Sequence, residues 1–219
     1  MKNIIVVGDS FCKSPEAWPS QLAELLNLNL INFGLEGGAW WSVKSFLQKI
    51  PLEQIDKCEV IVFAHTNAQR IPTTVKEVNQ VNFSNLNLNN ELDQAVGLYY
   101  KYIFDQDFLE WTQLKWFEEI NNQWHNTKVV HLFSFPQHQK YVLNGMKVLP
   151  SLAAISLDEI GSKDGSLSND TRLNHLNTHN NAELAQQLSQ LIGNYQVGEV
   201  DLDVSKFNLL SNNWIQKWN

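Results

Sequence analysis

Three short stretches of the chain are continuously apolar and rich in valine and isoleucine. They are KNIIVVG (residues 2–8), CEVIVFA (58–64) and KVVHLFS (128–134). A run of this length without alternation is typical of a strand that is covered on both faces. Two weaker runs, LNLINFG (28–34) and LAAIS (152–156), are further strand candidates. The pattern therefore predicts a sheet built from buried strands.

Between these runs, apolar residues recur with helical spacing. A Ser14-Pro15 pair has the types of a helix N-cap and first helical residue, although Pro19 interrupts the pattern and could mark the true start. The apolar positions of three predicted helices are Leu22, Leu25 and Leu26; Val43, Phe46, Leu47 and Ile50; and Leu184, Leu188 and Leu191. Strands that alternate with helices predict a parallel sheet with helices on both faces.

Two segments depart from this alternation within a single predicted domain, residues 1–219. Residues 72–126 begin with a polar, asparagine-rich part that predicts a loop, and continue with two helical stretches. We interpret them as a helical hairpin inserted between two strands. Residues 194–219 have no clear period and predict an extended tail packed by its aromatic side chains, Phe207, Trp214 and Trp218.

Composition narrows the class of protein. The 219 residues are 43% hydrophobic and 18% charged, which supports a packed core. The net charge is −7 and no basic run occurs, so nucleic acid and anionic membranes are poor candidate partners. The apolar run near the N-terminus is too short for a signal peptide, and no stretch is long enough to span a bilayer. We therefore expect a cytoplasmic protein.

Neither the cysteines nor the histidines form a metal-binding or disulfide pattern. Cys12 and Cys58 are the only cysteines, which fits a reducing compartment. His175 and His179 are four residues apart, but Leu176 stands where a zincin motif needs glutamate. The sequence predicts no metal and no cofactor.

The first apolar run ends abruptly at Gly8-Asp9-Ser10. Ligands of parallel sheets bind at the carboxyl ends of the strands. A serine at that edge, just before a helix, is placed as a nucleophile whose own N–H could stabilise an oxyanion. The alternative is an ordinary strand-to-helix turn, because all three residue types favour turns.

The stretch GDSF (8–11) also resembles the first block of the GDSL/SGNH hydrolase family, which uses Ser, Gly, Asn and His from four separated blocks. The second block is similar to NFGLEGGAWWS (32–42), where Asn32 precedes Gly37 by five residues. Gly37 would then supply a second oxyanion donor through its N–H. The alternative is a flexible glycine turn before a helix.

The third block resembles FAHTNAQRI (63–71), with Asn67 as a side-chain amide donor. The usual Gly-x-Asn-Asp pattern is incomplete, because His65 and Ala68 stand at the glycine and aspartate positions. Arg70 adds a cation near the predicted cleft that could hold a carboxylate or phosphate of a substrate. We take Asp9 and Arg70 as candidate substrate-binding residues.

The fourth block resembles NDTRLNHLNTHNNAELAQQL (169–188), which offers His175 as the general base. The family has aspartate three residues before this histidine, where the chain has Arg172. Asp170 is our preferred triad acid; Asp164 or a backbone carbonyl are alternatives. A surface histidine that caps a helix is the rival interpretation of His175.

The resemblance implies a three-layer α/β/α sandwich of about five parallel strands with flavodoxin-like order. It also implies hydrolysis of a small-molecule or carbohydrate ester through an acyl-enzyme, and it leaves the oligomeric state open. The inserted helices could form a lid, or their aromatic residues could simply pack on the sheet; those residues are Tyr99, Tyr100, Trp111 and Trp116. The alternative function is a carbohydrate- or protein-binding module on the same scaffold.

Overall fold

The computed structural model describes residues 1–70, 91–136, 141–156 and 175–209. Its centre is a parallel six-stranded sheet with the order β2-β1-β3-β4-β5-β6, so the predicted fold class and flavodoxin-like order are confirmed, with one strand more than expected. The strands are β1 (Asn3–Gly8), β2 (Asn29–Gly34), β3 (Cys58–His65), β4 (Lys128–Phe133), β5 (Met146–Leu149) and β6 (Gly198–Asp201).

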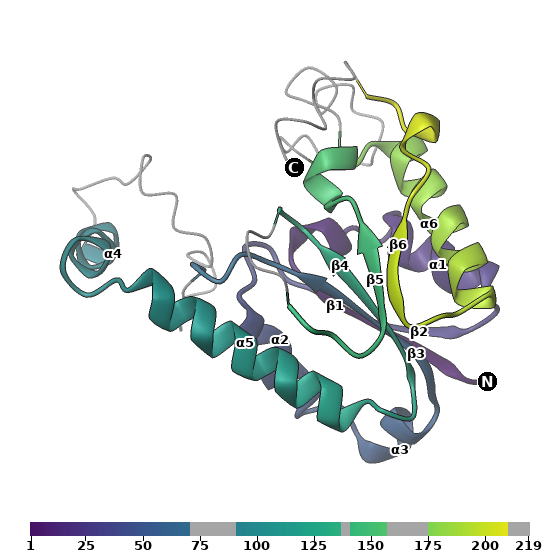
Figure 1. The fold of residues 1–219 in the computed structure, drawn as a ribbon, viewed down its shortest axis with the longest axis horizontal. Helices are drawn as coiled ribbons and strands as arrows, with labels where there is room; N and C mark the ends of the chain where they lie inside the picture. Colours follow the sequence, from purple (N-terminus) through teal and green to yellow (C-terminus); the bar gives the residue numbers. More distant parts are fainter. Residues whose placement is uncertain (71–90, 137–140, 157–174, 210–219) are drawn as a thin grey trace.

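Helices cover both faces of this sheet (Figure 1). The α-helices are α1 (Trp18–Leu25), α2 (Trp40–Leu47), α3 (Leu52–Asp56), α4 (Glu91–Tyr102), α5 (Gln106–Gln123) and α6 (Thr178–Gly193). Short 3-10 turns are η1 (Ser10–Cys12), η3 (Leu152–Ile155) and η5 (Val204–Lys206). Of the two starts considered for α1, the one near Pro19 is confirmed: Ala17 is its N-cap and Pro19 lies in its first turn, so the Ser14-Pro15 pair precedes the helix.

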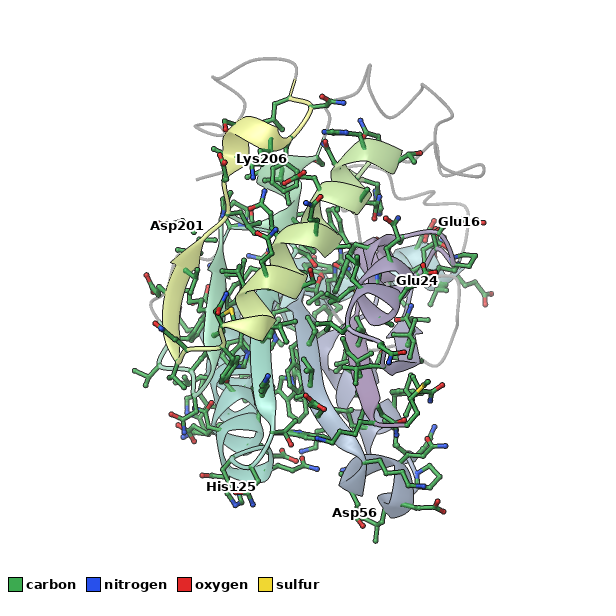
Figure 2. All side chains as sticks on the ribbon, turned by 90° about the vertical axis from the view of Figure 1, so that its right-hand side faces the viewer. Glu16, Glu24, Asp56, His125, Asp201 and Lys206 are labelled. Atoms are coloured by element: carbon green, nitrogen blue, oxygen red, sulfur yellow. The ribbon has the colours of Figure 1, made fainter. Side chains whose placement is uncertain are left out.

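Successive residues of each central strand enter two separate cores because side chains alternate between the faces of a strand. On one face, Ile4 and Val6 pack with residues of α1 and α6, and Figure 2 shows these two helices side by side in front of the sheet. On the other face, Ile5 and Val7 pack with residues of α2 and α5. Burial on both faces explains why the strands are continuously apolar.

Helix α5 belongs to one helical layer of the sandwich, together with α2. Trp116, Phe117 and Ile120 on α5 are fully buried against the sheet, so this helix is the crossover connection between β3 and β4. α4, in which Val96 is the one buried residue, lies beyond this layer at the outer end of α5 (Figure 1). The interpretation of both helices as one inserted hairpin therefore needs correction for α5.

One expectation about strands was wrong. Residues 152–156 are mostly the buried turn η3, because a short apolar run does not by itself distinguish a strand from a buried helical turn. The last strand, β6, was not predicted and lies within the segment expected to be an extended tail. It is an edge strand with exposed polar residues, so it carries no apolar run. Trp214 and Trp218 lie outside the described residues.

No helix within the described ranges is long and apolar enough to cross a membrane.

Candidate active site

The first strand delivers Ser10 to the carboxyl edge of the sheet. β1 ends at Gly8, Asp9 follows in an extended conformation, and η1 begins at Ser10. The Asp9 side chain caps this turn, since Oδ1 accepts a hydrogen bond from the Phe11 N–H at 3.2 Å. The aspartate between strand and turn therefore fixes how the serine leaves the sheet.

The neighbouring strand β2 holds the same turn from the side. The Asn32 amide donates to the Cys12 carbonyl oxygen at 2.7 Å. A Cβ at Gly34 would lie 2.5 Å from the backbone of Cys12 and Lys13, which is closer than real Cβ atoms approach. Glycine at position 34 thus lets the turn that begins at Ser10 pack directly on β2.

A histidine 165 positions along the chain meets the serine. His175 Nε2 lies 2.8 Å from Ser10 Oγ, which is the hydrogen-bond contact expected between a serine nucleophile and its general base. For Nε2 to accept the hydroxyl proton, the neutral imidazole must carry its own proton on Nδ1. Both residues line a small surface hollow, so the pair can be reached from outside.

The imidazole of His175 is held in its plane by Phe11. The two rings are stacked with their centroids 4.8 Å apart and an interplanar angle of 13°. Phe11 directly follows Ser10, so a residue of the Ser10 turn also packs on the His175 ring. The FCK stretch after Ser10 offered no sequence signal for this role.

Asn181 on α6 connects the segment that carries His175 to the part of the chain near Ser10. Its Oδ1 accepts from the Trp18 N–H at 2.8 Å, and its amide donates to the carbonyl oxygens of Leu176 and Asn177 at 2.8 and 2.9 Å. The Trp18 indole in turn donates to the Phe11 carbonyl oxygen at 3.1 Å. Asn181 and Trp18 therefore link the segment after His175 to the turn that carries Ser10. Sequence reasoning missed these links because they join residues that are far apart in the chain.

The predicted oxyanion donors follow three neighbouring strands. Ser10 follows β1, Gly37 follows β2 and Asn67 follows β3, and these strands are adjacent in the sheet. Gly37 has a φ of +64°, in the left-handed region that glycine favours. The exposed Asn67 accepts from the Gln69 N–H through Oδ1 at 2.9 Å, which leaves its NH₂ group as the outward donor. Topology thus brings the three loops to one edge.

The two candidate substrate-binding residues face each other in the interior. Arg70 Nη1 lies 3.1 Å from Asp9 Oδ2, and the side chains are 8% and 0% exposed. Burial lowers the pKa of Arg70 and the adjacent Asp9 carboxylate opposes that shift. The cation expected to meet a substrate anion is therefore already neutralised by an internal carboxylate.

The predicted triad acid, Asp170, and its alternative, Asp164, lie outside the described residues. His179 faces away from a shared site with His175, because its Nε2 lies 2.9 Å from the Lys206 carbonyl oxygen. Within the described ranges, no three His, Cys, Asp or Glu side chains gather as metal ligands would.

The four aromatic residues considered for a lid have different positions. Trp116 on α5 is buried against the sheet, which matches the packing alternative. Trp111 is 53% exposed, and the Tyr100 hydroxyl donates to the Gln69 carbonyl oxygen at 2.7 Å. Tyr99 contacts the ring of Tyr100 edge-on. α4 is therefore attached to the loop that carries Asn67.

Comparison with known proteins gives the following. No protein-family profile matches the chain. No curated protein matches it either. Among solved structures, a protein of the G-D-S-L family from Desulfitobacterium hafniense DCB-2 aligns over 87% of this chain and 99% of its own, with 13% identity and a TM-score of 0.40. A lipase/acylhydrolase from Enterococcus faecalis aligns over 91% of this chain and 100% of its own, with 13% identity and a TM-score of 0.39. The case for a function therefore rests on the geometry of the site.

Proposed function

We propose that this chain is a serine hydrolase that cleaves carboxylic esters through an acyl-enzyme. The observation that carries the proposal is the 2.8 Å contact between Ser10 Oγ and His175 Nε2. A hydroxyl is a weak nucleophile until a base takes its proton, and a neutral imidazole is the side chain best suited to do so near pH 7. Both groups line a small surface hollow, which supports the proposal that the pair meets a substrate from outside.

In the proposed reaction, Ser10 Oγ attacks the acyl carbon while its proton passes to His175 Nε2. The carbonyl oxygen becomes an oxyanion that the Ser10 and Gly37 N–H groups and the Asn67 amide stabilise. The C–O bond to the alcohol then breaks, and the departing alkoxide takes the proton from His175. A water molecule repeats the sequence on the acyl-enzyme and releases the carboxylic acid. Asp170 is the proposed carboxylate that orients the imidazole.

The test is release of p-nitrophenol from p-nitrophenyl acetate by the purified chain. We expect the wild type to exceed buffer and Ser10→Ala to fall to the buffer rate. Ser189→Ala is the matched control, because this hydroxyl lies on α6 away from the hollow and donates to the Gln186 carbonyl oxygen of its own helix at 2.8 Å. A wild type that is no faster than buffer for acetyl, butyryl and octanoyl esters would contradict the proposal.

A binding module on the same scaffold is the second candidate function. The observation that favours it is a pair of exposed aromatic rings on α5, Phe108 and Trp111, whose centroids are 6.2 Å apart. Exposed rings of this kind can stack on sugars or on a partner protein. A fluorophosphonate probe separates the candidates, because it labels an activated serine and leaves an idle one unmodified.

A further inference from the structure

Arg70 contacts all three loops that carry the proposed oxyanion donors. It lies in the loop after β3, where its own N–H donates to the Asn67 carbonyl oxygen at 3.2 Å. Its side chain crosses to the loop after β1, where Nη1 donates to Asp9 Oδ2 at 3.1 Å. The same Nη1 reaches the loop after β2 and donates to the Gly38 carbonyl oxygen at 3.3 Å.

Each of these contacts is to a proposed donor residue or to its direct neighbour in the chain. Asp9 precedes Ser10 and caps its turn through Phe11. Gly38 follows Gly37. A shift of the guanidinium would therefore move the Ser10 and Gly37 loops relative to Asn67.

The surroundings of Arg70 suit a fixed structural tie. The arginine side chain is 8% exposed and the Asp9 side chain is fully buried. The guanidinium carbon lies 5.2 Å from the centre of the Phe135 ring. A planar guanidinium held by a carboxylate, a carbonyl and an aromatic face has little rotamer freedom left.

We propose that Arg70 is the positioning residue of the oxyanion hole, which sets the relative placement of the three loops that carry Ser10, Gly37 and Asn67. This inference rests on the proposed function. It replaces the expectation that Arg70 binds an anionic substrate, because the guanidinium is buried and paired with Asp9. Donors in an oxyanion hole act through their exact placement around the developing charge, so a small displacement reduces kcat more than it weakens substrate binding.

The test variant is the double substitution Asp9→Asn/Arg70→Met. It removes both buried charges together, so no unpaired charge remains inside the protein. The asparagine keeps an oxygen for the Phe11 N–H, and the methionine keeps an unbranched stem against Phe135. Lys147→Met is the matched control, because it breaks an ion pair of similar length, 2.8 Å to Glu199, on the β5–β6 side of the sheet.

We expect the double variant to retain its fold by circular dichroism and to lose roughly 100-fold in kcat for p-nitrophenyl acetate, with KM changed by less than about twofold. The control should keep the wild-type kcat. Asn67→Ala should also lower kcat, and adding it to the double variant should cost much less than the product of the separate losses, because both changes disable one device.

Three results would overturn the inference. A folded double variant with wild-type kcat would show that Arg70 does not position the site. Multiplicative losses with Asn67→Ala would show that Arg70 acts elsewhere. A loss confined to the KM of an anionic ester, such as p-nitrophenyl hemisuccinate, would return Arg70 to substrate binding. In each of these three results the wild type is active, so the proposed function stands. An inactive wild type would overturn the proposed function together with the inference. If the double variant does not fold, Arg70→Lys replaces it: lysine keeps the charge but loses the planar guanidinium that reaches Asp9 and Gly38 together, so kcat should fall with KM little changed, and the loss should not multiply with that of Asn67→Ala. A folded Arg70→Lys with wild-type kcat, or with multiplicative losses, overturns the inference.

Discussion

Two pairs of side chains in this protein are joined through an imidazole at almost the same distance. Ser10 Oγ and His175 Nε2 are 2.8 Å apart at the carboxyl edge of the sheet. His65 Nε2 and His131 Nδ1 are 2.9 Å apart inside the sandwich. The first pair lines one hollow. In the second pair His65 lines another hollow, with Gly8 and Trp40, whereas His131 is fully buried.

The difference teaches that hydrogen-bond length does not distinguish a reactive pair from a structural one. Burial lowers the pKa of His131 to about 4 and lowers that of His65 well below its ordinary value, so both inner rings stay neutral. The His131 ring is fully buried, and the two rings bond to each other and to the Asn144 carbonyl oxygen rather than to a hydroxyl. The His175 ring combines a bonded hydroxyl with access from outside, and this combination supports a catalytic role.

The largest expected effect separates the two pairs by function. We expect His175→Gln to lower kcat for p-nitrophenyl acetate by about 10⁶-fold, since removing the base disables the nucleophile. His131→Gln should change kcat per folded molecule by less than about threefold, because this residue is remote from the reacting atoms. Comparable losses in both variants would remove the distinction between the pairs.

The second effect concerns what orients the reactive imidazole. We expect Asp170→Asn to lower kcat by about 10⁴-fold, because the carboxylate would fix the Nδ1–H tautomer and stabilise the imidazolium. Asp164→Asn is the control and should leave kcat unchanged. If the effects are exchanged, Asp164 is the acid; if neither variant loses activity, a backbone carbonyl orients His175.

The third effect is a pH dependence that arises from the inner pair. Between pH 6.5 and about 4 the unfolded chain binds a proton at His131 that the folded chain excludes. The free energy of unfolding should therefore be highest above pH 6.5 and fall by about 3 kcal/mol as the pH drops through this window. Urea titrations at several pH values measure this.

The matched variant for that titration replaces the whole pair. His65→Leu/His131→Leu removes both titrating rings and leaves no single imidazole without its partner. Its unfolding free energy should lose the part of the pH dependence that lies between pH 6.5 and 4. A slope equal to that of the wild type would place the acid sensitivity in other groups.

The smallest effect tests the support of the reactive pair. Asn181→Leu removes the ties to Trp18 and to the loop that carries His175, and we expect kcat to fall about tenfold through a less ordered base. Asn194→Leu at the exposed end of the same helix is the control. Equal rates in both variants would show that His175 needs no support from Asn181.

The sequence predicted the central strands well because burial on both faces leaves a continuous apolar run. The resemblance to the GDSL/SGNH blocks implied that Ser10 and His175 meet. The 2.8 Å contact agrees with that expectation. Strand β6 was missed because an exposed edge strand carries no such run.

From the sequence, Arg70 was predicted to bind substrate, because it is a cation near the predicted cleft. Its partner Asp9 is 61 positions away, and only the packing of β1 beside β3 brings the two together. The supporting roles of Trp18 and Asn181 depend on contacts of the same long-range kind. Tertiary pairing of polar residues therefore lies beyond local patterns.

The most direct test of the central claim is fluorophosphonate labelling of the intact chain, followed by mass-spectrometric mapping of the adduct. The account predicts one adduct on Ser10 in the wild type and none in His175→Gln, whereas His131→Gln should be labelled like the wild type. No adduct on Ser10 in a folded wild type, or equal labelling of Ser10 with and without His175, would contradict it.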